Sequence, residues 1–184
     1  MQGFTLVETL VAIAILTMTI VGPYQITGSV LSSAYIARDQ LVATGLAQEG
    51  IEYIRAIRDS NYLYNVHNTA SLAWLSGLDG TNGPNCFTNG CVVDPTQYPA
   101  SVPFVAGTSV IDCGSGDATC STKPLYISSA NLYNQQSSGT ATPFVRKVLL
   151  RTVNSNETEI TVTVTWSNHG VHTVTLKENL QNWL

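Results

Sequence analysis

The chain is predicted to have an α+β fold, in which a long N-terminal helix packs on a C-terminal antiparallel sheet. Residues 9–21 are largely apolar and carry no charge, which is typical of a helix buried in lipid or protein. Apolar side chains then recur every three or four residues up to Arg58, as on one face of a helix. Near the C-terminus, residues 159–166 alternate strictly between apolar and polar side chains, as in a half-buried strand.

The N-terminal stretch Gly3-Phe4-Thr5-Leu6-Val7-Glu8 places one carboxylate, Glu8, at the start of the apolar run, and no other charged residue follows until Arg38. A bare charge in a membrane helix costs about 2.5–3.5 kcal/mol at the helix centre and less toward the interface. We therefore expect Glu8 to have a partner. Since no cation lies within a helical turn or two of it, that partner should come from another chain or from a newly made amine.

Gly, an aromatic residue, Thr, Leu and Glu at this spacing before an apolar helix resemble the processing site of type IV prepilins and of type II secretion pseudopilins. The resemblance implies that a prepilin peptidase cuts between Gly3 and Phe4 and N-methylates Phe4. It also implies that Phe4 and Glu8 act in subunit assembly and that the fold is pilin-like. An ordinary secretory signal would instead have its cleavage site after the apolar run, and no A-x-A site follows Val21.

The leader Met1-Gln2-Gly3 departs from the family pattern because it is very short and has no Lys or Arg. Family leaders are longer and basic, in keeping with a cytoplasmic N-terminus. Either this leader is unusually brief or the true start lies upstream.

The resemblance also implies a function, a location and partners. The expected function is a structural subunit, major or minor, of a type IV pilus; the alternatives are a type II secretion pseudopilin and a pilus-tip subunit for DNA uptake or adhesion. The subunit would span the inner membrane once before assembly and lie in an extracellular filament afterwards. Its partners would be other pilin subunits, the prepilin peptidase, the inner-membrane assembly machinery and, before assembly, membrane lipid.

Composition argues against other classes of protein. Charged residues make up 11% of the 184 residues and the net charge is −4, which is too little charge of the wrong sign for binding nucleic acid through a basic surface. No Gly-x-Ser-x-Gly, P-loop, His-Glu-x-x-His or Cys-x-x-Cys motif occurs, and His67, His169 and His172 have no partners at catalytic spacing. We expect no enzyme, no catalytic residue and no cofactor.

Gly22-Pro23 should break or kink the helix, because Pro removes a backbone hydrogen bond and clashes with the preceding turn. The resemblance implies that this segment can unwind when subunits pack into a filament. Beyond it, residues 24–58 carry one apolar stripe and should pack on a soluble domain, and Asp59-Ser60-Asn61 should end the helix. The stripe consists of Leu46, Gly50, Ile51, Ile54 and Ile57.

Four cysteines fall in two close pairs, Cys86 with Cys91 and Cys113 with Cys120. Three connectivities exist, and the local one is favoured because Gly and Asn between the paired residues let the chain fold back. A zinc site is the rival interpretation, but zinc knuckles space their cysteines more closely and an exported chain meets oxidising conditions.

The region between the helix and the C-terminal strands is rich in turn residues, apart from an expected short helix over 70–78 that carries Trp74. Asp79-Gly80-Thr81-Asn82-Gly83 has half the composition of a calcium loop but lacks its alternating acids and final Glu. We interpret it as a turn and predict no metal site. Calcium at this turn, or at Asp112 and Asp117, stays open because some pseudopilins bind calcium in their distal loops.

The C-terminal part is predicted to be an antiparallel meander with one buried face. Residues 144–153 form its first strand, Glu159 to Trp166 its second and 171–177 its third, and the tail 179–184 caps the core. The expected segments are a leader (1–3), a membrane-spanning half-helix (4–23), an amphipathic half-helix (24–58), a loop-rich region with the Cys pairs (59–143) and the meander with its tail (144–184).

Overall fold

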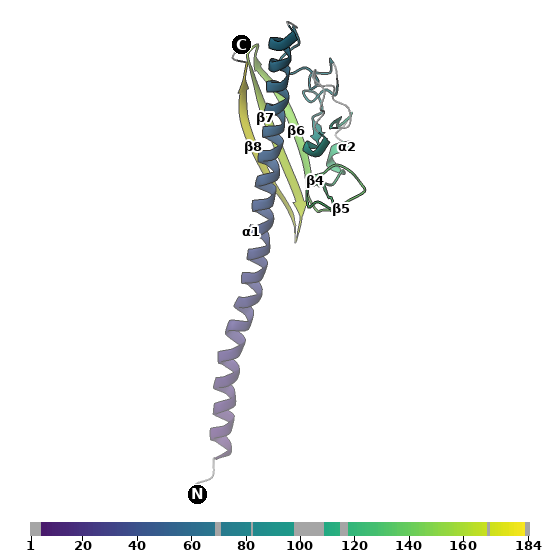
Figure 1. Cartoon of the computed structure of the whole chain (residues 1–184). Coiled ribbons are helices and arrows are strands. Elements are labelled where there is room, and N and C mark those ends of the chain that lie inside the picture. The colour runs from purple at the N-terminus through teal and green to yellow at the C-terminus, as the bar shows by residue number, and fades with distance from the viewer. Residues whose placement is uncertain are drawn as a thin grey trace. The chain divides into compact units, whose positions relative to one another are not determined.

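The computed structural model describes residues 5–68, 71–81, 83–97, 109–114, 118–168 and 170–182. The chain forms two compact units, Met1–Leu41 and Val42–Leu184. One helix, α1 (Leu6–Asn68), contributes to both units. The other elements belong to the second unit (Figure 1), and they are β1 (Cys91–Val93), η1 (Pro95–Gln97), β2 (Val110–Asp112), α2 (Ala118–Ser121), β3 (Tyr126–Ile127), β4 (Tyr133–Asn134), β5 (Thr140–Ala141), β6 (Val145–Asn154), β7 (Glu157–Ser167) and β8 (Val171–Gln181).

The first unit is helical from Leu6 onward, and its helix runs through Gly22 and Pro23 without interruption. The helix therefore shows no break at these residues, while a kink or an unwinding on assembly stays a prediction. Pro23 has no N–H to donate to the carbonyl four residues before it, but a single missing bond leaves the rest of the helical ladder intact. The Thr27 hydroxyl donates to the Pro23 carbonyl at 2.8 Å and adds a bond within the same turns.

In the second unit, α1 buries the predicted apolar stripe, which confirms that part of the prediction. Ile54 and Ile57 have no exposed surface, and Leu46, Gly50 and Ile51 are also buried. The spacing of three and four residues places these side chains on one face, and the sheet covers that face.

The helix ends ten residues later than Arg58, so the stop predicted at Asp59-Ser60-Asn61 is wrong. These residue types favour turns because their side chains compete for backbone partners. Here the Ser60 hydroxyl donates to the Ala56 carbonyl one turn back, at 2.7 Å. Asn61 is fully buried and its side-chain amide donates to the Ser76 carbonyl at 3.0 Å. The Ser60 hydroxyl and the Asn61 amide nitrogen thus find backbone acceptors without ending the helix, while the buried Asn61 Oδ1 has no hydrogen-bond partner among the described residues.

The main sheet has five strands in the order β2-β1-β6-β7-β8, all antiparallel. Strands β6, β7 and β8 form the predicted meander, and Figure 1 shows α1 lying across it. Ile160, Val162, Val164 and Trp166 of β7 are buried, as the alternation predicts. Strand β8 continues past the predicted end into the expected tail, and Leu180 is buried in the core. Trp183 and Leu184 lie outside the described residues.

The loop-rich region contains more regular structure than predicted. It supplies β1 and β2 to the main sheet and forms a second sheet of order β4-β3-β5. The short helix expected over 70–78 is wrong over its described part, because residues 74–78 form successive turns. Gly77 has φ 88°, a conformation that ends a right-handed helix.

Two disulfides join Cys86 to Cys91 and Cys113 to Cys120, with Cα atoms 5.0 Å apart in each pair. The first loop is held on the main sheet, because the N–H of Leu150 in β6 donates to the Cys86 carbonyl at 3.0 Å. Gly90 within this loop has φ 82°, and a Cβ there would lie 2.8 Å from the Val148 carbonyl. The loop therefore depends on glycine for its close approach to β6.

A buried arginine connects the helix to two strands of the sheet. Arg146 of β6 has no exposed surface. Its guanidinium donates to the Leu46 carbonyl of α1 at 3.0 Å and to the Val93 carbonyl of β1 at 2.9 Å, and it pairs with the Glu49 carboxylate. Burying a charge without such partners is strongly unfavourable, so these contacts fix α1, β6 and β1 together.

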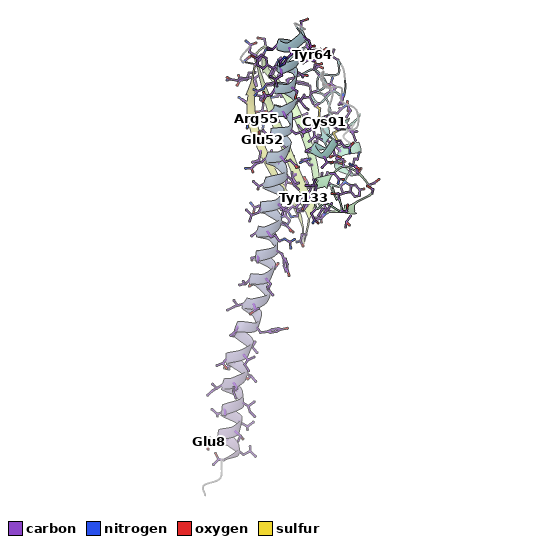
Figure 2. All side chains as sticks on the ribbon, in the orientation of Figure 1. Glu8, Glu52, Arg55, Tyr64, Cys91 and Tyr133 are labelled. Atoms are coloured by element: carbon purple, nitrogen blue, oxygen red, sulfur yellow. A yellow bond between two sulfur atoms is a disulfide. The ribbon has the colours of Figure 1, made fainter. Side chains whose placement is uncertain are left out.

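At the β8 edge of the sheet, Arg55 of α1 donates through Nε to Glu178 of β8 at 3.0 Å and pairs with Glu52 on the helix (Figure 2). The hydrogen bond to Glu178 raises the pKa of the Arg55 guanidinium. The side chain is 36% exposed, so solvent screens this pair and it contributes little to stability.

Replacing Arg146 by Ala should destabilise the second unit by about 3–5 kcal/mol. The substitution leaves a cavity, and it leaves the three partners of the guanidinium without their donor. Arg146→Met should cost less, since it fills most of the volume without a charge. Urea unfolding of the full chain in detergent, followed by circular dichroism, measures both. Arg151→Ala is the matched control on the same strand, because that side chain is 72% exposed. The assigned role fails if Arg146→Ala is no more destabilising than Arg151→Ala.

Removing the Cys86–Cys91 disulfide by a double Cys→Ser substitution should loosen its loop and leave β7 and β8 intact. A disulfide with a sequence separation of 5 stabilises the folded state by about 2 kcal/mol at most, because it restrains only a short loop of the unfolded chain. Hydrogen exchange should therefore quicken within residues 86–93 and stay unchanged across 157–181. Exchange that quickens equally in both segments would show that the disulfide supports the whole unit.

Candidate assembly site

The first unit exposes an apolar surface all around its helix. Every large hydrophobic side chain from Leu6 to Tyr35 is more than half exposed. A helix that is apolar on all sides is stable only inside lipid or among other apolar elements. By length and composition this helix can cross a membrane, and none of its most apolar 18-residue window is buried.

Six hydroxyl groups on this helix are satisfied within the helix itself. Each of the six donates to a backbone carbonyl three or four residues earlier, so it needs neither water nor a neighbour. An unsatisfied hydroxyl would be costly in an apolar environment. The pairs are Thr9 to Leu6, Thr17 to Ala14, Thr19 to Leu16, Thr27 to Pro23, Ser29 to Ile26 and Ser33 to Ser29, at 2.8–3.0 Å.

Glu8 is the charged group of the apolar stretch, and it lies in the first turn of α1 (Figure 2). The backbone N–H groups of Glu8 and Thr9 donate to the Thr5 carbonyl at 3.1 and 3.3 Å. The positive end of the helix dipole favours a carboxylate here. Within the described residues, the ion pairs do not include Glu8, and its side chain is exposed. The Glu8 carboxylate is thus exposed on a helix whose surface is otherwise mainly apolar.

The other residues predicted for this site fall elsewhere. Gly3 and Phe4 lie outside the described residues, so cleavage and methylation stay predictions. Gly22 and Pro23 lie within the helix, fourteen and fifteen positions beyond Glu8. The hydrogen bonds of these hydroxyls within the helix were not predicted, although each Thr or Ser stands three or four residues after its acceptor.

The candidate calcium ligands have structural partners instead. Asp79 accepts the Thr81 N–H at 2.9 Å, which is turn chemistry. Asp112 accepts the N–H groups of Gly114 at 2.7 Å and Asn85 at 3.2 Å. No group of three His, Cys, Asp or Glu side chains that could hold a metal occurs in the described part of the chain. Asp117 lies outside it.

The described histidines show no catalytic arrangement. His172 stacks on Trp166 with ring centroids 5.4 Å apart, and its Nε2 lies 3.0 Å from the Asn168 carbonyl. His67 lies in the last turn of α1. His169 is outside the described residues.

Comparison with known proteins agrees with the geometry of the first unit. Residues 1–22 match a protein family described as the prokaryotic N-terminal methylation motif. The chain carries the prepilin signal that is typical of type IV pilins and pseudopilins. No curated protein and no solved structure matches the chain.

The match confirms the family resemblance predicted from Gly3 to Glu8. It identifies a pilin-like structural protein and not an enzyme. The long helix packed on a C-terminal antiparallel sheet is a pilin-like α+β fold. The prepilin signal implies processing by a prepilin peptidase and assembly with other pilin subunits.

Proposed function

We propose that this pilin-like protein is a structural subunit, major or minor, of a type IV pilus. The observation that carries the proposal is the apolar helix of the first unit, which exposes its side chains on every face and follows a prepilin signal. Such a helix is insoluble alone, and lipid before assembly or neighbouring subunit helices afterwards would cover it. The subunit would thus lie in the inner membrane first and in an extracellular filament later, with the assembly machinery moving it between the two.

The segments of the chain take separate roles in this proposal. Residues 1–3 are the leader, 4–23 the membrane-spanning half of the helix, and the remainder of α1 carries the buried stripe. The region up to residue 143 supplies the disulfide-linked loops, and residues 144–184 supply the meander. Gly22 and Pro23 mark the point at which the helix would unwind on assembly, because Pro23 has no N–H and the helix lacks one backbone hydrogen bond there.

Glu8 sets the axial register of subunits in this proposal. Cleavage makes Phe4 a positively charged amine, and the amine of an incoming subunit pairs with Glu8 of its neighbour. In a low dielectric, attraction and desolvation are both large and nearly cancel. A misplaced subunit, however, leaves a bare carboxylate among apolar side chains, so the pair penalises wrong registers more than it stabilises the right one.

Filament imaging tests the proposal as a whole. In a strain that lacks this protein, surface filaments should be absent if it is the major subunit, and fewer or shorter if it is a minor one. Restoring the gene should restore them, and the protein should be recovered from sheared filaments. Normal surface filaments without the protein, together with loss of exoprotein secretion, would assign it to type II secretion and overturn the pilus assignment.

Processing gives a direct prediction. Protein extracted from filaments should begin at N-methylated Phe4, because Gly3-Phe4 matches the peptidase site. Intact mass and N-terminal sequencing measure this, and a strain without the peptidase should retain Met1-Gln2-Gly3. A mature chain cut after Val21 would exclude the prepilin mechanism.

Substitution of Glu8 should impair assembly and spare folding. Glu8→Leu and Glu8→Gln should lower the fraction of subunit in sheared filaments by about tenfold or more, since each leaves the neighbour's amine without a counterion and ~1.4 kcal/mol corresponds to tenfold. Glu8→Asp should be intermediate because its arm is shorter. The assay compares filament and membrane fractions in a strain without the wild-type copy.

Glu52→Gln is the control for a carboxylate on the same helix, since Glu52 is 64% exposed and belongs to the second unit. It should enter filaments normally. Cleavage after Gly3 should be unchanged in every variant. Normal incorporation of Glu8→Leu would mean that the carboxylate does not set register.

A further inference from the structure

The second unit contains a cavity of about 160 Å³ that the assembly function does not use. Three segments line it: the turns that follow α1, the disulfide-closed loop 86–91, and the end of the β6–β7 hairpin. The lining residues are Ala73, Trp74, Leu75, Asp79, Phe87, Thr152, Asn154, Ser155 and Thr158.

One wall of the cavity is polar although it continues the core-facing side of the sheet. Leu150 and Ile160 face the core as neighbouring cross-strand partners. The next cross-strand pair on the same face of the sheet is Thr152 with Thr158. Thr158 is 2% exposed. Thr152 is exposed, so this face of the sheet changes from apolar core to a hydroxyl-bearing rim that solvent reaches where the cavity begins.

The sheet is also irregular at this wall. The register of β6 and β7 shifts between Thr152 and Asn154, which leaves Val153 without a cross-strand partner. Such bulges re-aim side chains and are over-represented beside binding sites. Here the bulge lies between two residues that line the cavity.

The turns after α1 and the disulfide-closed loop add aromatic residues to the lining, and their backbone is held in place. Trp74 and Phe87 are partly buried and pack against the core. The Trp74 carbonyl accepts a hydrogen bond from buried Asn61 at 3.3 Å, and the Phe87 N–H donates to the Asn85 side chain at 3.0 Å. Cys86, beside Phe87, is fixed by its disulfide. Two aromatic side chains on restrained backbone form a preorganised surface, which lowers the entropy lost on binding.

The lining excludes most ligand classes. Among the described residues, no Lys or Arg lines the cavity, and Asp79 contributes a negative charge, so an anion is disfavoured. One carboxylate supplies too few oxygen ligands for a divalent cation. A wholly apolar ligand would bury Asp79 and the hydroxyls without partners. The cavity is smaller than the roughly 300–1,000 Å³ of sites for drug-sized ligands, so it holds one small ring.

We propose that this cavity binds a single neutral pyranose sugar. Such a ring has an apolar C–H face, which would lie against Trp74 and Phe87, and a rim of hydroxyls, which would donate to Asp79 and exchange hydrogen bonds with Thr152 and Ser155. Asp79 uses Oδ1 to accept the Thr81 N–H, and a carboxylate has acceptor capacity for further bonds. The site is independent of Glu8 and of assembly.

Saturation-transfer NMR on the full chain in detergent tests the proposal with glucose, galactose, mannose and N-acetylglucosamine as probes. At least one sugar should receive saturation at its C–H protons, with a midpoint on the order of 1 mM, the affinity that a ligand of this size reaches at ordinary efficiency. The methyl glycoside of that sugar distinguishes the source: equal binding assigns the end of a glycan, and binding of the free sugar alone assigns a free monosaccharide.

Two variants locate the site. Trp74→Ala should abolish the signal, but it also removes core packing. Asp79→Asn avoids that problem, because the amide oxygen can keep the bond to Thr81 while the charge is lost and the second acceptor oxygen becomes an NH2 donor, and it should weaken binding by about tenfold. Asp39→Asn, a carboxylate outside the cavity, should change nothing. The proposal is overturned if none of the four sugars binds saturably, or if Asp79→Asn binds as the wild type does.

Discussion

The second unit depends on how closely α1 approaches β7, and Gly50 sets that distance. A Cβ added at Gly50 would lie 3.1 Å from Cγ1 of Val162, which is tighter than ordinary packing allows, and 3.5 Å from Cδ of Arg146, which is an ordinary van der Waals contact. Ala43 and Ala47 precede Gly50 on the same helix face, at steps of four and then three residues, and are fully buried. This line of small residues lets the helix backbone come near the sheet. At that distance the Arg146 guanidinium reaches the carbonyl of Leu46, so close packing and the buried charge are parts of one arrangement.

Periodicity predicted the elements that are long and buried on one face. The stripe from Leu46 to Ile57 and the alternation from Ile160 to Trp166 each repeat often enough to define a face. Strands β1 to β5 have only two or three residues, which is too few for a period. The end of α1 could not be predicted from local preference, because the partner of Asn61 is the Ser76 carbonyl fifteen residues later. Arg146, by contrast, had a signal in the alternation, which points it inward with Val148 and Leu150.

The candidate assembly site was predictable to a greater extent because it is local. Gly3, Phe4 and Glu8 are close in sequence and follow a motif, so no tertiary information is needed to find them. The cavity beside Trp74 is the opposite case. Its walls come from residues near 74, 87 and 152, and only the folded chain brings them together. The uneven distribution of charge is also visible in the sequence. Of the 8 basic and 12 acidic residues, only Glu8 precedes Arg38.

The core of the second unit joins a helix and strands that lie far apart in the sequence, and this affects how the protein is made. The buried stripe of α1 ends at Ile57, whereas the strands that cover it begin at Val145. At about 5–20 residues per second, several seconds of synthesis separate the stripe from its cover. During that interval Leu46, Ile54 and Ile57 have no sheet to pack on, and an exposed apolar stripe favours aggregation. A nascent chain of this design therefore has to be shielded by another surface, either lipid or a chaperone, until its last strands emerge.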